Sequence, residues 1–157
     1  MGRIRVLIGI LGLDQHELGA IAVSKMLRDA GMEVIYAGRF NLPPMILAMA
    51  LEEDVDVVGL SCHSWEYLHF VPELLDLLGQ RELRIPVVLG GSVITPGDAD
   101  ALIRRGVTAA FGPGSADEAI VEAIRSMASR KHQSAGARVD AGRGGSPGPA
   151  NPGDHNQ

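Results

Sequence analysis

Apolar runs of strand length alternate with segments of helical period along the first 128 residues of the chain. The apolar runs fall at residues 5–10, 33–36, 55–60, 86–89 and 109–111, and short clusters of Gly, Pro and Asp punctuate them. The helical segments fall at residues 17–30, 43–53, 66–78, 97–105 and 116–128. Successive strand–helix units predict a parallel sheet, because parallel neighbours need a long crossover that is usually a helix.

The apolar runs also indicate how the sheet is covered. Residues 55–60 are apolar except for Asp56 near the start, as in strands that are buried on both faces. We therefore expect an α/β fold of the Rossmann-like (flavodoxin-like) kind, with a five-stranded parallel sheet and helices on both faces.

The length of 157 residues fits one domain with a sizeable core, which we place at residues 1–128. After Ala128 the composition changes. Residues 134–157 are rich in Gly, Pro, Ser, Ala and Asn, and Val139 is their one branched aliphatic residue. Such a segment buries too little apolar surface to offset its chain entropy, so we expect residues 129–157 to form a disordered tail rich in Gly, Pro and Ser.

Charge and composition argue against several classes of partner. The net charge is −5, and 4% of the residues are aromatic, so neither electrostatics nor base stacking favours nucleic acid. The amino-terminal apolar run is too short to span a membrane and lacks a typical cleavage site. The single cysteine, Cys62, permits a reducing compartment. We expect a cytoplasmic protein with no nucleic-acid or membrane partner.

The segment Asp14-Gln15-His16-Glu17-Leu18-Gly19 directly follows the first apolar run. A histidine binds a metal through one ring nitrogen, while a carboxylate commonly holds the proton on the other nitrogen. We therefore predict that His16 is a metal ligand and that Asp14 orients its ring.

Three further marked segments follow later strands. They contain Ser61-Cys62-His63, Gly90-Gly91-Ser92 and Gly112-Pro113-Gly114. The carboxyl ends of parallel strands meet at one edge of a sheet, where ligands bind, so together these segments predict a cleft. The alternative is that the glycines only make strand-to-helix turns. The predicted ligand-binding residues are Asp14, Gln15, His16, Glu17, Gly19, Ser61, His63, Gly90, Gly91, Ser92, Gly112 and Gly114.

The ordered pattern Asp14-x-His16-x-x-Gly19, Ser61, Gly90-Gly91 resembles the cobalamin-binding domain of methylmalonyl-CoA mutase and its relatives. The resemblance covers residues 3–127, with weaker similarity at residues 30–36, 71–74 and 111–114. It implies an adenosylcobalamin cofactor in the base-off form, in which His16 replaces the cofactor's own dimethylbenzimidazole as the lower cobalt ligand. It also implies that the nucleotide tail lies in the cleft.

The matching positions imply particular roles. Asp14 would hold the imidazole, Gly19 would let the tail pass beside the first helix, Ser61 would meet the buried base, and Gly90 with Gly91 would line the tail channel. His63 departs from the pattern, because it stands where the family has leucine. It either hydrogen-bonds the nucleotide or is a rim histidine without a contact.

Neighbouring residues allow other interpretations. Cys62 beside His63 suggests a thiol nucleophile, but adjacent strand residues point to opposite faces, so we expect Cys62 to be a small buried residue. Trp65 and Tyr67 either pack or meet the corrin or a partner subunit.

The resemblance implies the small subunit of an adenosylcobalamin-dependent acyl-CoA mutase, an isomerase. A separate, barrel-type large subunit would bind the acyl-CoA. Such a barrel needs about 250 residues of its own, so the 157 residues of this chain cannot form it. We expect a hetero-oligomer. Two alternatives stay open. One is a corrinoid methyl carrier or cobalamin sensor, although methyl carriers usually place a helical bundle ahead of this domain. The other is a receiver-type signalling domain without a corrinoid, which needs a second acidic cluster near Asp14 and Glu17.

Overall fold

The computed structural model describes residues 2–140 of the chain, and it describes side chains for residues 2–130. Strands and helices alternate throughout this part. In chain order they are β1 (Arg5–Leu11), α1 (Leu18–Asp29), β2 (Glu33–Asn41), α2 (Pro43–Glu52), β3 (Val57–Ser61), α3 (Tyr67–Gln80), β4 (Val87–Gly90), α4 (Pro96–Arg105), β5 (Ala109–Phe111) and α5 (Asp117–Asp140).

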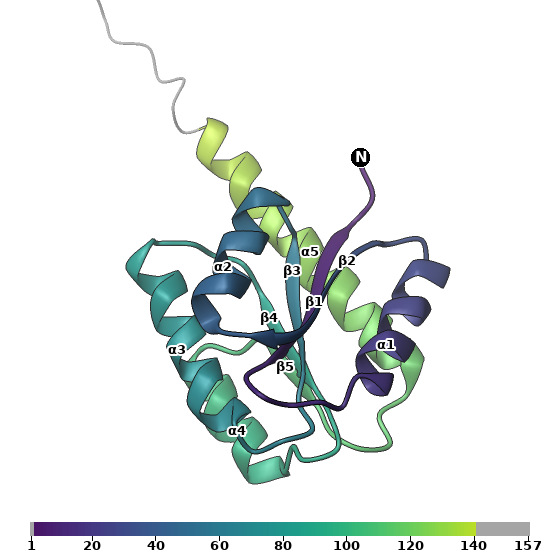
Figure 1. Cartoon of the computed structure of the whole chain (residues 1–157). Coiled ribbons are helices and arrows are strands. Elements are labelled where there is room, and N and C mark those ends of the chain that lie inside the picture. The colour runs from purple at the N-terminus through teal and green to yellow at the C-terminus, as the bar shows by residue number, and fades with distance from the viewer. Residues whose placement is uncertain (1, 141–157) are drawn as a thin grey trace, which may run out of the picture.

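The strands form one parallel sheet in the order β2-β1-β3-β4-β5 (Figure 1). The predicted Rossmann-like, flavodoxin-like fold with a five-stranded parallel sheet is therefore confirmed. From β1 the chain moves outward to β2 and then returns past β1 to β3. In folds of this kind, the reversal of strand order between β1 and β3 opens a crevice at the carboxyl ends of these strands.

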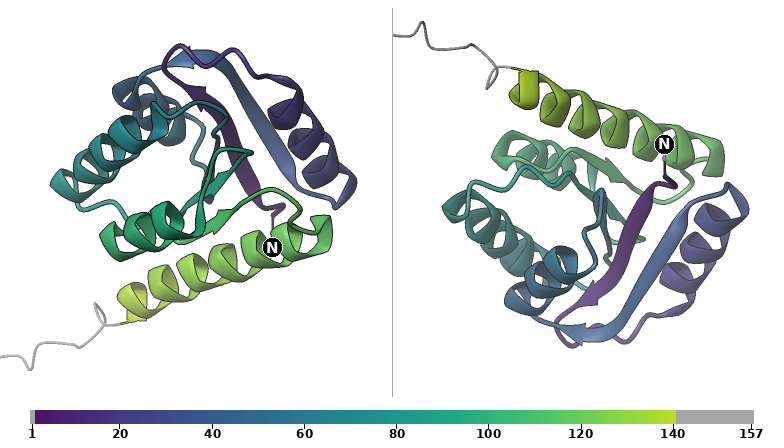
Figure 2. Two further views of the ribbon diagram at one scale, coloured as in Figure 1. Left: turned by 90° about the horizontal axis from the view of Figure 1, so that it is seen from below. Right: turned by 90° about the horizontal axis from the view of Figure 1, so that it is seen from above.

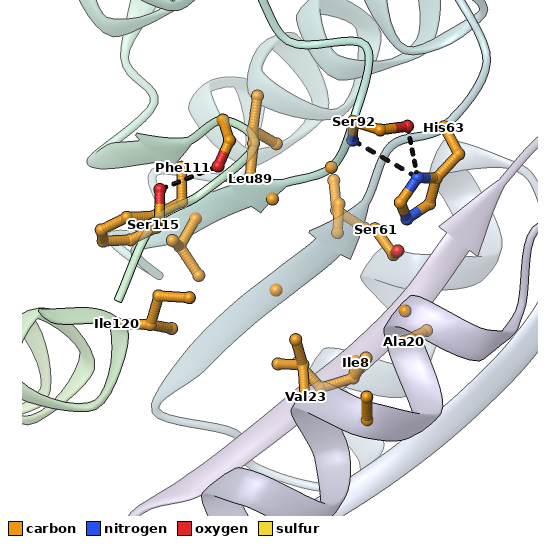
Figure 3. A pocket seen from close by; sticks show the side chains of 18 of the residues that line it. Ile8, Ala20, Val23, Ser61, His63, Leu89, Ser92, Phe111, Ser115 and Ile120 are labelled. Carbon is orange, nitrogen blue, oxygen red and sulfur yellow. Dashed lines mark hydrogen bonds between the residues drawn. The ribbon is translucent and has the colours of Figure 1, made fainter. Parts of the chain in front are cut away.

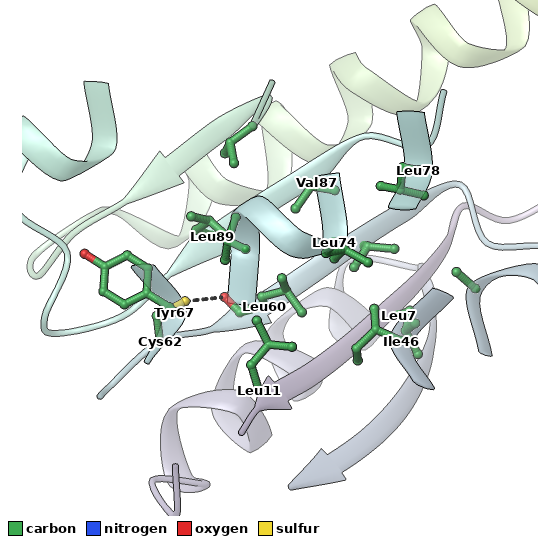
Figure 4. Close-up of a cluster of buried hydrophobic side chains, with 14 of the residues drawn as sticks. Leu7, Leu11, Ile46, Leu60, Cys62, Tyr67, Leu74, Leu78, Val87 and Leu89 are labelled. Atoms are coloured by element: carbon green, nitrogen blue, oxygen red, sulfur yellow. Dashed lines mark hydrogen bonds between the residues drawn. The ribbon is translucent and has the colours of Figure 1, made fainter. Parts of the chain in front are cut away.

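Helices cover both faces of the sheet, as predicted (Figure 2). One face carries α2, α3 and α4, and the other carries α1 and α5. Alternate side chains of β1 enter the two cores: Leu7 packs with Ile46 and Leu74 (Figure 4), whereas Ile8 packs on the side of Leu27. Burying one such aliphatic side chain contributes about 1.5–3 kcal/mol to stability, so the two cores hold the strand ends that carry the site.

Strand β2 is longer than its apolar run at residues 33–36 indicates. It continues to Asn41 through two register shifts against β1 and through Gly38, whose φ is +74°. The Asn41 side-chain amide is buried and donates hydrogen bonds to the carbonyl oxygens of Gly38 (2.9 Å) and Ile10 (3.3 Å). Because β2 is an edge strand, polar residues interrupt its apolar pattern and hide its true length.

Helix α5 is also longer than expected. It continues past Ala128 to Asp140, so the expected end of this helix at residue 128 is wrong, whereas the division into a domain and a tail stays a prediction. Residues 129–140 include Arg, Lys, Gln and Ala, which are good helix formers, although the average composition of the longer segment resembles a disordered chain. The remainder of the expected tail, residues 141–157, lies outside the described residues.

None of the helices within residues 2–140 has the length and apolar character that crossing a lipid bilayer requires.

Candidate functional site

The loops that follow β1, β3, β4 and β5 meet at the carboxyl edge of the sheet (Figure 1). The loop after β1 carries Asp14 and His16, and it lies beside the β1–β3 switch point. The loops after β3 and β4 carry His63 and Ser92. The sheet topology therefore gathers the residues that the sequence marks at separate positions.

Asp14 and His16 form a hydrogen-bonded pair. Asp14 is 5% exposed, and its Oδ1 accepts hydrogen bonds from the backbone N–H of His16 at 3.0 Å and from the ring Nδ1 at 2.8 Å. An ionised carboxylate only accepts, so the ring proton lies on Nδ1 and Nε2 keeps its lone pair. The His16 side chain is 68% exposed, so a ligand can reach Nε2.

The environment of Asp14 keeps its carboxylate charged. Burial by itself raises the pKa of Asp14, but the backbone N–H groups of His16 and His63 and the His16 ring stabilise the ionised form. The net result is a pKa below the ordinary value for Asp14. Asp14 is therefore suited to hold the imidazole of His16 in one tautomer and one orientation.

Two hydrogen bonds tie the loop after β1 to the loop after β3. The backbone N–H of His63 donates to Oδ2 of Asp14 at 2.9 Å, and the backbone N–H of Leu13 donates to Oε2 of Glu66 at 2.8 Å. Gly12, with φ +65°, brings the chain against Glu66, and a Cβ at this position would clash with the Glu66 carboxylate. The position of His16 is therefore set from both loops.

A cavity of about 380 Å³ lies next to these loops, between α1, α5 and the carboxyl halves of β3 and β4 (Figure 3). Its volume falls in the range of small-molecule and cofactor sites. The walls are largely apolar, with Ile8, Val23, Leu89, Phe111 and Ile120. Polar groups come from Ser61, His63, Ser92, Ser115 and Asp117.

Glycines let the backbone form much of the cavity wall. Gly91 has φ +156°, and a Cβ there would overlap the carbonyl oxygen of Cys62. A Cβ at Gly59, in the middle of β3, would lie 2.6 Å from Cδ1 of Ile8, so its absence brings two strands together at the cavity floor. Other glycines in the lining are Gly19, Gly90, Gly112 and Gly114.

Most of the predicted ligand-binding residues come together in this cavity. The lining includes Gly19, Ser61, His63, Gly90, Gly91, Ser92, Gly112 and Gly114. These glycines therefore do more than make strand-to-helix turns, because they also line the cavity. Asp14 and His16 lie in the adjoining loop, where the His16 ring centroid is 5.8 Å from that of His63.

Gln15 and Glu17 are not among the residues that line the cavity. Gln15 is exposed, and Glu17 accepts a 2.6 Å hydrogen bond from the hydroxyl of Tyr36 and lies 3.5 Å from Nε of Arg39. Glu17 thus links the start of α1 to β2 rather than lining the cavity. Burial and the Glu17 carboxylate raise the pKa of Tyr36 to about 12.

The burial of Cys62, Tyr67 and Trp65 tests the alternative roles that the sequence suggests for them. Cys62 is buried, and burial raises its thiol pKa, so it is a packing residue as predicted and not a nucleophile. Tyr67 is buried and donates a 3.2 Å hydrogen bond to Asp98, so it packs. Trp65 is 74% exposed and is free to meet a ligand or a partner.

Sequence reasoning missed several lining residues. Asp117 and Ile120 come from α5, and Ile8 and Val23 come from inside regular elements, where their patterns indicate only a core. Gly59 had a usable signal, because a lone glycine within a buried strand marks a close approach of backbone or ligand.

The site has one imidazole but no complete ligand set for a bare metal ion. Within the part of the chain whose side chains are described, no group of three or more His, Cys, Asp or Glu residues is placed to hold a metal. A single accessible histidine beside a cavity fits a metal that arrives in its own macrocycle, with an appendage that enters the cavity. The residues present therefore fit a corrinoid and do not fit a structural zinc or magnesium site.

Comparisons with known proteins agree with this geometry. The profile of the B12 binding domain family matches residues 4–123. The pivalyl-CoA mutase small subunit of Xanthobacter autotrophicus is 40% identical over 138 residues, covering 87% of this chain and 90% of that protein. The 2-hydroxyisobutanoyl-CoA mutase small subunit of Aquincola tertiaricarbonis is 39% identical over 124 residues, covering 79% and 91%. A solved cobalamin-binding protein from Desulfitobacterium hafniense shares the fold, with a TM-score of 0.68 at 22% identity over 80% of this chain and 59% of that one.

The fold, the site and the family match define a cobalamin-binding domain, and the chain belongs to the B12-binding family. Within it, the chain is a member of the group of acyl-CoA mutase small subunits. The expected family and the cobalamin cofactor are thus confirmed, and a signalling domain without a corrinoid is excluded.

Proposed function

We propose that this chain carries adenosylcobalamin for an acyl-CoA mutase and presents it, base-off and ligated by His16, to a large catalytic subunit. The observation that carries the proposal is the exposed His16 ring, held by the buried Asp14 carboxylate beside a cavity of about 380 Å³. When bound, the cofactor supplies a cobalt–carbon bond whose homolysis starts a radical 1,2-rearrangement of the acyl carbon skeleton.

His16 would hold cobalt through Nε2. Its Nδ1–H is already committed to Asp14, so the ring offers a metal only the other nitrogen. The hydrogen bond to an anionic carboxylate also increases the basicity of Nε2, which would strengthen its bond to cobalt. Asp14 is therefore a positioning residue that acts through His16.

The cavity would take the nucleotide tail. Ser61, at the end of β3, offers a hydroxyl that both donates and accepts hydrogen bonds, while Gly90 and Gly91 leave space along the wall. The apolar side chains opposite are suited to the faces of an aromatic base. Gly112 and Gly114 line the part of the cavity next to β5.

Large apolar side chains are exposed next to His16 and His63 in the sequence. Leu13 is 73% exposed, Leu18 is 85% exposed and Trp65 is 74% exposed, and all three lie in the loops at the carboxyl edge of the sheet or directly beside them. Large apolar side chains gathered around a binding site are typical of surfaces that a ligand or another protein covers. We assign this rim to the corrin and to a barrel-type large subunit that binds the acyl-CoA, in a hetero-oligomer.

The test of His16 is the visible spectrum of bound cobalamin. The wild-type chain should give the base-off, histidine-ligated spectrum, and a His16→Ala variant should lose it. His69→Ala is a matched control, because His69 is exposed on α3 and does not line the cavity. A His16→Ala protein that keeps the wild-type spectrum would contradict the assignment.

The test of the mutase role is purification of the chain with its co-expressed large subunit, followed by a screen of acyl-CoA isomers. Pivalyl-CoA and 2-hydroxyisobutanoyl-CoA are the first candidates, because related small subunits carry these names. Isomer interconversion that depends on both subunits is the expected result. Capture of a methyltransferase in place of a large mutase subunit would favour the methyl-carrier alternative.

A further inference from the structure

His63 lies in the wall of the cavity with one ring nitrogen fixed. Its Nδ1 accepts a hydrogen bond from the backbone N–H of Ser92 at 3.3 Å and lies 2.9 Å from the Ser92 hydroxyl oxygen (Figure 3). At the other end of the residue, the backbone N–H is bound to Asp14. The ring is thus anchored from the loop after β4 and its backbone from the loop after β1.

These contacts determine the tautomer of His63. A backbone N–H is always a donor, so Nδ1 must be the acceptor and cannot carry a proton in this arrangement. The proton of the neutral ring therefore lies on Nε2. In contrast to a serine hydroxyl, which rotates to donate or accept, this Nε2–H is a donor with a fixed direction.

The Nε2–H makes no hydrogen bond within the part of the chain whose side chains are described. Among residues 2–130 no acceptor lies within hydrogen-bond distance of it. Nε2 lies against the first turn of α1, and the ring fits there because residue 19 is glycine: a Cβ on Gly19 would lie 2.7 Å from Nε2. His63 and Gly19 both line the cavity, so this edge of the ring borders the space that a ligand would fill.

The three serine hydroxyls of the lining are less selective. The Ser115 hydroxyl already donates to the carbonyl oxygen of Gly112 at 2.8 Å, and the Ser92 hydroxyl lies against His63. Ser61 can act as donor or acceptor. A ligand that covers an N–H donor displaces the water bound to it. If the ligand has no matching acceptor, the donor loses a hydrogen bond and gains none, so such a ligand binds more weakly.

We propose that His63 is a specificity-determining residue that selects corrinoids by their lower base. Its Nε2–H donates a hydrogen bond to an acceptor nitrogen of a benzimidazole or purine in the nucleotide tail. Leucine, which the family pattern has at this position, offers packing but no donor. The inference rests on the proposed function, since it assumes that the tail enters the cavity.

The experiment compares two ligands on the full-length chain by isothermal titration calorimetry. One ligand is cobalamin, and the other is a cobamide with the same upper ligand whose lower group is p-cresol, which has no ring nitrogen. The measured quantity is the ratio of the two dissociation constants. Because both ligands bind the same protein sample, the ratio is insensitive to losses of stability in a variant.

The preference is compared with wild type, because cobalamin must release its own base to bind base-off and the p-cresol cobamide has none to release. His63→Leu should reduce the preference for cobalamin by about fivefold to tenfold relative to wild type, the effect of one net hydrogen bond. His63→Gln should retain most of the preference, because its amide N–H reaches about as far as Nε2. His69→Leu is the control and should match wild type. Unchanged selectivity in His63→Leu would overturn the role of His63 alone, whereas a wild-type chain that binds neither corrinoid would overturn the proposed function as well.

Discussion

The backbone N–H of His63 donates a 2.9 Å hydrogen bond to Oδ2 of Asp14, although 49 positions separate the two residues in the sequence. The other oxygen of the same carboxylate holds the backbone and the ring of His16. One buried side chain therefore sets the predicted cobalt ligand at a defined position relative to the cavity wall. Four consequences of this arrangement and of the packing around it can be measured.

Replacing Asp14 with asparagine should destabilise the protein. An asparagine amide has one acceptor oxygen, so at least one N–H of His16 or His63 would face the N–H₂ group. We expect the free energy of unfolding to fall by about 1–3 kcal/mol in urea denaturation at neutral pH. Asp29→Asn is the control, because Asp29 pairs with Lys25 on the exposed face of α1, and it should change stability by less than about 0.5 kcal/mol. Equal losses in both variants would show that Asp14 has no special structural role.

The stability advantage of the wild-type chain over the Asp14→Asn variant should depend on pH. The folded pKa of Asp14 lies below its ordinary value, so the unfolded chain binds the proton more readily. The resulting stabilisation is fully present well above the unfolded pKa of about 3.9 and is lost as pH falls through the folded pKa. The difference in unfolding free energy between wild type and Asp14→Asn should therefore shrink between about pH 5 and pH 3. A difference that grows on acidification would have the wrong sign.

Gly91→Ala should damage the cavity wall. The new Cβ would overlap the carbonyl oxygen of Cys62, and neither atom can move without the backbone, so the loop after β4 must shift. We expect a loss of about 3 kcal/mol or more and weaker cobalamin binding. Gly79→Ala is the matched control, because Gly79 lies in α3 with open space around it, and alanine should stabilise the helix by about 0.5–1 kcal/mol. Chemical denaturation of both variants distinguishes a steric effect from a general cost of replacing glycine.

The two tyrosines of the chain should ionise late. Burial and a neighbouring carboxylate raise the pKa of Tyr36 and of Tyr67 to about 12, with Glu17 acting on Tyr36 and Asp98 on Tyr67. The tyrosinate absorbance of the folded protein should rise with a midpoint of about 12, against about 10 in urea. Because the folded pKa values are raised, the two residues contribute stability that is fully present below about pH 10 and is lost as pH rises through about 12. A midpoint near 10 in protein that circular dichroism shows to be folded would contradict the described environments.

The periodicity of the chain was sufficient to predict the sheet, because buried parallel strands must be apolar on both faces and the helices between them must repeat every 3.6 residues. The edge strand β2 and the end of α5 escaped this reasoning. Polar residues interrupt the pattern of β2 after Tyr36, and an averaged composition concealed the helix formers that follow Ala128.

The pairing of Asp14 with His16 was predictable, since two residues of separation place a carboxylate within reach of the following ring without help from the rest of the fold. The tie to His63, the direction of its Nε2–H and the contribution of Gly59 and Ile8 to the cavity were not. These features depend on the register in which β1, β3 and β4 pair. They also depend on how the side chains of neighbouring elements pack around the cavity. Local order along the chain is set by covalent spacing and hydrophobic period, whereas a cavity is a property of surfaces that meet only after the strands have paired.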